Sequence, residues 1–198
     1  MRSADDLPVE IQQLYQVFDW RNAVAILSTV HSSDFSEILD VLSRFRLRYS
    51  DVSQGGGNKS QISKFIDSNL YASGWKEVSF DTKFVVDGTE YPSPTHSVDC
   101  FKGKIALEVE WNNKDPFFDR DLNNFRLLYD LRIVDVGVIV TRATSLQTTL
   151  TGVGRAATTF GKATTHTEKL YPKIRGGGAG GCPVLVFGIK PEAYVDDR

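Results

Sequence analysis

Three carboxylates lie close together in one short stretch of this sequence, between Asp99 and Glu110. Residues 104–110 alternate apolar with other side chains, which predicts a β-strand that carries Glu108 and Glu110 on one face. A hairpin over residues 97–111 would bring Asp99 beside Glu108. Carboxylates buried together are costly unless a cation is bound, and hard oxygen ligands favour Mg²⁺, Mn²⁺ or Ca²⁺. Because carboxylate-bound Mg²⁺ activates water against phosphodiesters, the stretch predicts hydrolytic chemistry. A surface hairpin with solvated acids and a non-catalytic Ca²⁺ site are the alternatives.

A helix is predicted directly after this hairpin. Asp115 is expected to be its N-cap and Pro116 its first helical residue. Asp119 and Asp121 are expected to lie near the positive end of the helix dipole. Helical spacing predicts a buried face made of Phe118, Leu122, Phe125 and Leu128.

The order of the elements predicts the fold class. Residues 133–141 form a Val-rich strand, so residues 104–141 would be a strand–helix–strand unit with parallel strands. Residues 183–189 would form a last buried strand. We therefore expect an α/β protein with a central mixed sheet flanked by helices. A single domain over residues 1–198 is expected, because no linker or internal repeat interrupts the chain.

The first half of the chain gives less distinct patterns. Residues 9–19 are predicted to be helical, and residues 20–29 fit either a strand or the end of a helix. A helix is expected to begin near Ser32. Residues 44–49 alternate Arg with apolar side chains, as in a strand with one basic face. Residues 75–87 are predicted to be one strand that ends in an Asp-Gly turn.

Composition excludes several classes of protein. The chain has 198 residues and 41% hydrophobic residues, which is enough for a full core. No apolar run is long enough for a membrane span, and the N-terminus lacks a signal-peptide pattern. Cys100 and Cys182 are too few for a disulfide framework and are expected to be core residues. A reducing cytoplasm is the expected location. His31 and His96 lack metal-ligand spacing and are expected to be structural or exposed.

The charge is distributed unevenly. Residues 142–190 contain seven Lys or Arg and only one acid, Glu168, and so carry +6, whereas the whole chain carries −2. The remainder therefore carries −8. This asymmetry favours an anionic partner at the C-terminal third, although a solvated basic surface is the alternative.

A glycine-rich loop at residues 55–60 precedes a predicted helix that ends near Gly74. Such a loop can bind a phosphate at the helix N-terminus. In this chain, Asn58 and Lys59 would contact the backbone of DNA. It does not match the Walker A pattern. A loop without a ligand is the alternative.

The spacing of Asp99, then eight residues, then Glu-x-Glu resembles the core of PD-(D/E)xK nucleases. Residues 98–110, 135–138 and 181–189, with the helix end at 74–77, are similar to BglII/BstYI-type restriction endonucleases. The resemblance is spread over residues 55–190, with a catalytic core at about 75–141. The third catalytic position is Glu110, where the wider superfamily usually has Lys, so the identity of the base stays open.

This resemblance implies a type II restriction endonuclease. Asp99 and Glu108 would bind Mg²⁺, which Mn²⁺ replaces in such enzymes, and Glu110 would complete the catalytic set. A homodimer would cut double-stranded DNA at a short palindrome and leave 5′-phosphates. A cognate DNA methyltransferase would be a genetic rather than a physical partner. A low-specificity repair or phage-defence nuclease and a catalytically silent DNA-binding module are the alternatives.

DNA recognition is expected in residues 142–182, on the C-terminal side of the sheet. Arg suits guanine edges, and Thr and Lys suit phosphates and bases. Beyond Asn58 and Lys59, the candidates for contact with DNA are Lys114, Arg142, Arg155, Lys162, Thr164, Thr165, His166, Lys169, Lys173 and Arg175.

Overall fold

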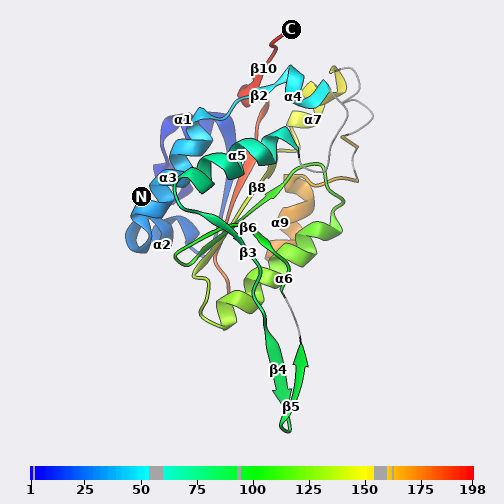
Figure 1. The fold of residues 1–198 in the computed structure, drawn as a ribbon. Coiled ribbons are helices and arrows are strands. Elements are labelled where there is room, and N and C mark those ends of the chain that lie inside the picture. Colours follow the sequence, from blue (N-terminus) through cyan, green and yellow to red (C-terminus); the bar gives the residue numbers. More distant parts are fainter. Residues whose placement is uncertain (2, 54–59, 93–94, 154–159, 162) are drawn as a thin grey trace.

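A six-stranded mixed sheet forms the centre of the molecule in the computed structural model, which describes residues 1, 3–53, 60–92, 95–153, 160–161 and 163–198 (Figure 1). The strand order is β1-β9-β8-β7-β6-β3. The three middle strands, β9 (Val184–Ile189), β8 (Val136–Arg142) and β7 (Ile105–Glu110), are parallel. The outer strands β1 (Tyr15–Trp20), β6 (Val98–Lys102) and β3 (Lys76–Val78) pair antiparallel with their neighbours. The predicted α/β fold class is confirmed.

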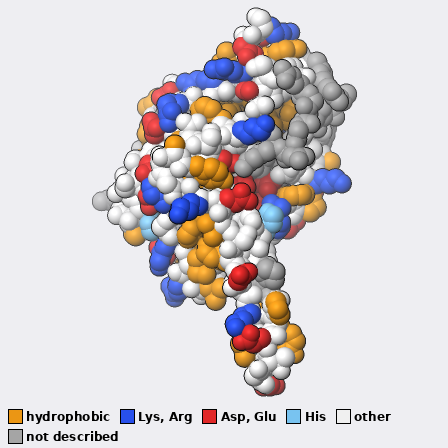
Figure 2. All heavy atoms as spheres, in the orientation of Figure 1, with side chains coloured by type: hydrophobic (Ala, Val, Ile, Leu, Met, Phe, Trp, Pro, Cys, Tyr) orange, Lys and Arg blue, Asp and Glu red, His pale blue; other side chains and the backbone are white. Residues whose placement is uncertain are grey.

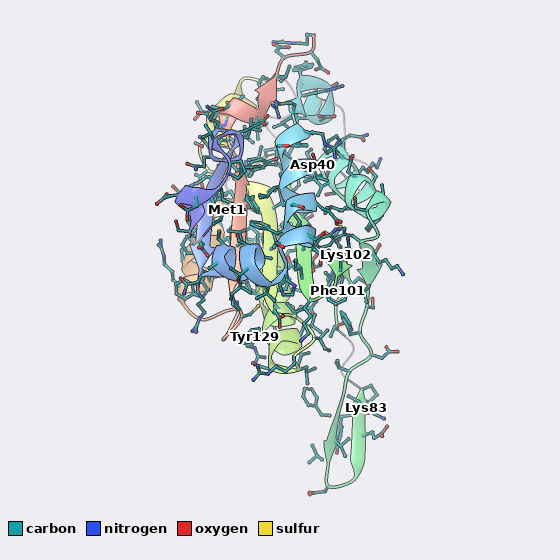
Figure 3. The ribbon with its side chains drawn as sticks, turned by 90° about the vertical axis from the view of Figure 1, so that its left-hand side faces the viewer. Met1, Asp40, Lys83, Phe101, Lys102 and Tyr129 are labelled. Carbon is teal, nitrogen blue, oxygen red and sulfur yellow. The ribbon has the colours of Figure 1, made fainter. Side chains whose placement is uncertain are left out.

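Helices cover both faces of the sheet. One layer consists of α1 (Val9–Leu14), α2 (Ala23–Val30), α3 (Ser32–Arg44) and α5 (Gln61–Ala72). The other layer consists of α6 (Pro116–Asp130) and α9 (Thr167–Arg175). Seen from the side, α2 and α3 lie in front of the sheet (Figure 3). Smaller elements are α4 (Tyr49–Ser53), α7 (Leu146–Thr151), β2 (Leu47–Arg48), β10 (Tyr194–Val195) and the short 3₁₀ helices η1 (Ala4–Asp6) and η2 (Pro191–Ala193).

The alternation in β7 divides the core into two layers. Ile105, Leu107 and Val109 pack on the side of α3 and α5, whereas Ala106 packs on the side of α6. Glu108 and Glu110 share the face of Ala106 because side chains along a strand alternate. The predicted strand–helix–strand unit of β7, α6 and β8 is present, with β7 and β8 parallel.

Helix α6 begins where the sequence predicts, with Pro116 in its first turn and the expected apolar residues buried. Asp115 does not act as a side-chain cap, and its backbone is already helical. Asp115 is thus the N-cap residue, as predicted, but without a capping hydrogen bond from its side chain. The Asp115 carboxylate instead lies 3.9 Å from Nζ of Lys169 on α9.

Other predictions for the first half need correction. Residues 9–19 are not one helix, because residues from Tyr15 onward pair with β9 and complete the sheet edge. Residues 75–87 are divided between β3 and a separate hairpin, and their Asp-Gly turn is confirmed. Residues 44–49 contribute only the two-residue β2 before α4 starts. Residues 20–29, for which the sequence fits either a strand or the end of a helix, are mostly in α2.

A hairpin of β4 (Lys83–Val86) and β5 (Thr89–Pro92) projects from the body, as Lys83 marks in Figure 3. Hydrophobic side chains gather on it (Figure 2), among them the exposed Phe84, Val86 and Tyr91. Within the described part of the chain, its two strands pair only with each other. By contrast, Cys100 and Cys182 are fully buried core residues, as predicted.

Close packing of α6 on β8 depends on Gly137. A Cβ at this position would lie 2.3 Å from Cδ2 of Phe125. We expect Gly137→Ala to lower the free energy of unfolding by about 1–3 kcal/mol, because a packed core resists added volume. Urea unfolding measures this, with Gly152→Ala as control, where the added Cβ would meet only an ordinary 3.5 Å contact. Equal stabilities would contradict this packing of Phe125.

Candidate active site

The β6–β7 hairpin brings Asp99 and Glu108 together. Cys100 pairs with Leu107, so Asp99 comes opposite Glu108. The backbone N–H of Asp99 donates to Oε2 of Glu108 over 3.3 Å, and the N–H of Val109 donates to Oδ2 of Asp99 over 3.0 Å. The two carboxylates are thus held by the backbone of the opposite strand, which limits their movement.

Glu108 lies in an environment that favours a cation. Its side chain is 1% exposed, and Oε1 has no hydrogen-bond partner among the described residues. Burial, and then the carboxylates of Asp121 and Asp99, raise the pKa of Glu108 well above its ordinary value. A bound cation would offset both the burial and the repulsion.

The donor set fits Mg²⁺. In the described part of the chain, no group of three or more His, Cys, Asp or Glu side chains is arranged to hold a metal by itself. Mg²⁺ commonly uses one or two carboxylates and keeps several waters or substrate phosphate oxygens. Asp99 and the unpartnered Oε1 of Glu108 are sufficient protein ligands on that basis.

Glu110 is fixed by two donors. Its Oε2 accepts a hydrogen bond from Nδ2 of Asn113 over 2.6 Å, and its Oε1 accepts one from Nη2 of Arg120 over 3.0 Å. Burial, and next the neighbouring Asp121, raise the pKa of Glu110 to about 9. In the metal-free protein Glu110 therefore keeps its proton at neutral pH.

Two residues of α6 complete the site, and the sequence reasoning assigned neither to it. Asp121 is 0% exposed, and its Oδ1 accepts from Nε and Nη2 of Arg120 over 3.0 and 2.8 Å. The prediction that Asp121 serves the helix dipole is wrong, because its side chain is buried beside Glu108 and Glu110. The sequence does contain a signal for the burial of Asp121, which lies three residues after Phe118 and four before Phe125, on the buried face of the helix.

A cavity of about 380 Å³ opens over these residues. Acidic side chains gather near the centre of this face of the molecule (Figure 2). His96 lines the cavity, and burial followed by the Arg120 charge lowers its pKa. His96 is exposed, which is one of its two predicted settings, and the structure adds that it borders this cavity. The cavity is also lined by Ser60, Ser63, Glu77, Asp99, Glu110, Asn113 and Arg120.

The segment after residue 160 touches the end of β7. Thr164 forms an isolated bridge with Lys114, and the N–H of Thr165 donates to the carbonyl of Asn113 over 2.8 Å. Lys114 is exposed next to the cavity. Thr165 is fully buried, which corrects its expected contact with DNA. Four of the predicted DNA-binding residues lie outside the described residues: Asn58, Lys59, Arg155 and Lys162.

Arg142 occupies an unexpected position at the end of β8. Its side chain is 1% exposed and donates to neutral oxygens of Gln147, Gly161, Thr164 and Thr165. Burial lowers its pKa to about 10. The predicted direct contact of Arg142 with DNA is corrected, because its guanidinium is occupied inside the protein.

The remaining candidates lie on or next to α9. His166 is mostly buried, and its Nδ1 lies 2.9 Å from Oγ1 of Thr144. Lys169 and Lys173 pair with carboxylates of α6 over 3.9 and 2.6 Å. Arg175 lies farther along α9, over the ring of Phe18. The structure thus brings Thr164 and His166 near the ends of β7 and β8 but carries Arg175 away from them.

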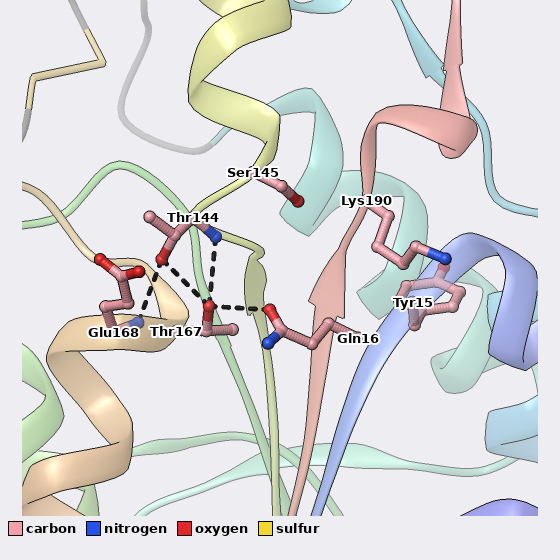
Figure 4. A pocket seen from close by; sticks show the side chains of 7 residues that line it. All are labelled: Tyr15, Gln16, Thr144, Ser145, Thr167, Glu168 and Lys190. Atoms are coloured by element: carbon pink, nitrogen blue, oxygen red, sulfur yellow. Dashed lines mark hydrogen bonds between the residues drawn. The ribbon is translucent and has the colours of Figure 1, made fainter.

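A second cavity, of about 530 Å³, lies at the same edge of the sheet (Figure 4). Thr144 follows β8 and is joined to the start of α9 by hydrogen bonds to Thr167 and Glu168. Thr167 also donates to Oε1 of Gln16 over 3.1 Å. The start of α9 is therefore anchored to both β8 and β1.

A mixed sheet whose carboxylate hairpin leads into a strand–helix–strand unit defines the restriction-endonuclease-like class of nucleases. Residues 15–189 match the model of the family Restriction endonuclease BglII/BglIII. The chain belongs to this family and is a DNA-binding nuclease. A search of curated proteins found no match. Among the described helices, none has the length and apolar character needed to cross a membrane.

Proposed function

We propose that the protein is a type II restriction endonuclease that hydrolyses double-stranded DNA at a short palindrome and leaves 5′-phosphates. One observation carries the proposal: in a chain of this family, the half-buried Asp99 lies opposite the buried Glu108, one oxygen of which has no partner among the described residues. A solvated surface hairpin would not bury that oxygen, which argues against the surface alternative.

Asp99 and Glu108 would hold Mg²⁺, and Mn²⁺ would substitute. Bound there, the ion would lower the pKa of a water and offset charge on the phosphate. Arg120 lines the cavity and is one-third exposed, so its guanidinium is available to a phosphate oxygen. Glu110, oriented by Asn113 and Arg120, would position the attacking water or assist the metal.

Sequence recognition would come from residues 142–182, a segment that begins at the C-terminal end of β8. Thr164, His166 and Lys169 are the described candidates nearest the site. A palindrome has two-fold symmetry, so a homodimer would place one active site on each strand. The enzyme would act in a prokaryotic cytoplasm alongside a separately encoded methyltransferase of the same specificity.

The first test is a digest of unmethylated phage DNA by the purified protein, with Mg²⁺ and with EDTA. We expect discrete bands only with Mg²⁺, and the sequences of the fragment ends give the site and the cut position. A smear would indicate a low-specificity nuclease instead. Intact DNA with both additions, together with retained binding, would indicate a silent DNA-binding module.

A further inference from the structure

Arg142 carries a buried charge that no acidic side chain of the described residues offsets. It forms no ion pair with Asp or Glu in this part of the chain, and its hydrogen bonds go to neutral oxygens. An uncompensated buried charge is costly, so a role in stability alone explains it poorly. The planar guanidinium offers donors in a fixed fork, which suits the simultaneous holding of several backbone groups.

The acceptors of Arg142 lie mainly in one short segment. Nε donates to the carbonyl of Thr165 over 3.0 Å. Nη2 donates to the carbonyl of Gly161 over 3.0 Å and to Oγ1 of Thr164 over 2.6 Å. The fourth acceptor is Oε1 of Gln147 in α7. One side chain from the end of β8 thus holds Gly161, Thr164 and Thr165 together.

Thr165 joins that segment to the catalytic strand. Its Oγ1 donates to the carbonyl of Glu110 over 3.3 Å, and its N–H donates to the carbonyl of Asn113 over 2.8 Å. Asn113 in turn donates from its side chain to the Glu110 carboxylate. Thr141 also donates to the carbonyl of Glu110, over 2.8 Å. Hydrogen bonds therefore run without a gap from Arg142 to the carboxylate of Glu110.

We propose that Arg142 and Thr165 are positioning residues that couple DNA contact at residues 163–169 to the orientation of Glu110. The inference rests on the proposed nuclease function. DNA that docks correctly on this segment leaves Glu110 oriented for cleavage. A near-cognate site that displaces the segment through Thr165 turns Glu110 away, so such DNA is bound but cut slowly.

The test uses Arg142→Lys and Thr165→Val in the full chain. Lysine keeps the charge but loses the fork, and valine keeps the shape but loses the hydroxyl. We expect single-turnover cleavage of saturated cognate DNA to fall about 10- to 100-fold, as for a small misplacement of a reacting group. DNA affinity, measured with Ca²⁺ in place of Mg²⁺, should change less than about 3-fold, since neither side chain is exposed to DNA.

Further variants exclude a merely structural effect. Thr165→Ser keeps the hydroxyl and should restore the rate. The cleavage rate of the double variant should fall by less than the product of the two single fold-losses, because both residues act through one path. Matched controls are Arg126→Lys and Thr29→Val, which alter exposed hydrogen bonds away from the site and should cleave normally.

Specific outcomes would overturn the coupling. An affinity loss equal to the rate loss would make the residues direct DNA ligands. Normal cleavage by both variants would leave Arg142 a structural residue only. Independent losses that multiply in the double variant would place the two residues on separate paths.

A readout without DNA separates this inference from the proposed function. Hydrogen exchange of the free Arg142→Lys protein should rise at residues 163–168, where Thr165 donates to Asn113, while exchange in β7 and β8 stays low. If the wild-type protein cleaves nothing, the proposed function fails, yet this measurement still tests whether Arg142 holds the segment. Unchanged exchange there would overturn the inference while the nuclease function stands.

Discussion

Asp99→Asn is expected to reduce Mg²⁺-dependent DNA cleavage by at least about 10³-fold, which corresponds to the several kcal/mol that a metal supplies to the transition state. Asparagine keeps an oxygen that can accept the hydrogen bond from the N–H of Val109, so the hairpin should remain intact. The loss would therefore come from the missing negative charge. Single-turnover cleavage of plasmid DNA measures the rate, and urea unfolding verifies the fold.

The matched control is Asp40→Asn on α3. Asp40 is exposed and pairs with Arg44 one helical turn farther along, so its replacement should change neither cleavage nor stability appreciably. Cleavage by Asp99→Asn at the wild-type rate would place the catalytic metal elsewhere. Loss of the fold would instead show that the Asp99 charge supports the hairpin.

Glu110→Gln is expected to raise the stability of the metal-free protein at alkaline pH. The pKa of Glu110 is about 9 in the folded chain, against an ordinary value of 4.5, because of burial and then Asp121. Between these values the folded chain holds a proton that the unfolded chain has lost, so wild-type stability falls as pH rises. Glutamine does not titrate. The free energy of unfolding of the Glu110→Gln variant, relative to that of the wild type, should therefore grow by roughly 3 kcal/mol from pH 5 to pH 8.

Urea unfolding in EDTA at several pH values tests this prediction. Mg²⁺ should reduce the difference in stability between the variant and the wild type, because a nearby cation favours the charged Glu110 carboxylate and lowers its pKa. Glu168→Gln is the control, since Glu168 is exposed on the surface. A constant difference between the Glu110→Gln variant and the wild type across the pH range would mean that Glu110 is already ionised near pH 5.

Local patterns predicted the parts of the fold whose periodicity is strong. The alternation of residues 105–110 gave the two faces of β7, and helical spacing gave the buried face of α6. Prediction was wrong at Tyr15–Trp20, where pairing with β9 outweighs a local helical pattern. It was also wrong for residues 75–87, because the chain leaves the sheet after β3 and forms its own hairpin.

The candidate site also has residues that local sequence patterns predicted and residues that only the tertiary structure brings there. Asp99, Glu108 and Glu110 follow from hairpin spacing, because cross-strand neighbours and period two act over a few residues. Spacing places Asp121 on the buried face of α6, but it does not show that Asp121 and His96 reach the site, since they come from α6 and from the chain before β6. Arg142 shows the opposite error: its charge suggested contact with DNA, whereas its buried side chain binds Gly161, Thr164 and Thr165.

The sequence by itself determined the carboxylate hairpin and the parallel unit that supports it, because each depends on short-range periodicity. Its resemblance to a known family indicated the nuclease class. Only the tertiary structure decided which carboxylates are buried together and which Lys and Arg side chains are left available for contact with DNA. Burial depends on packing between α6 and the sheet, and it sets both the raised pKa of Glu108 and the position of Arg142. A charged residue's type gives its chemistry, but only its surroundings decide whether that charge meets solvent, a partner or the protein's own backbone.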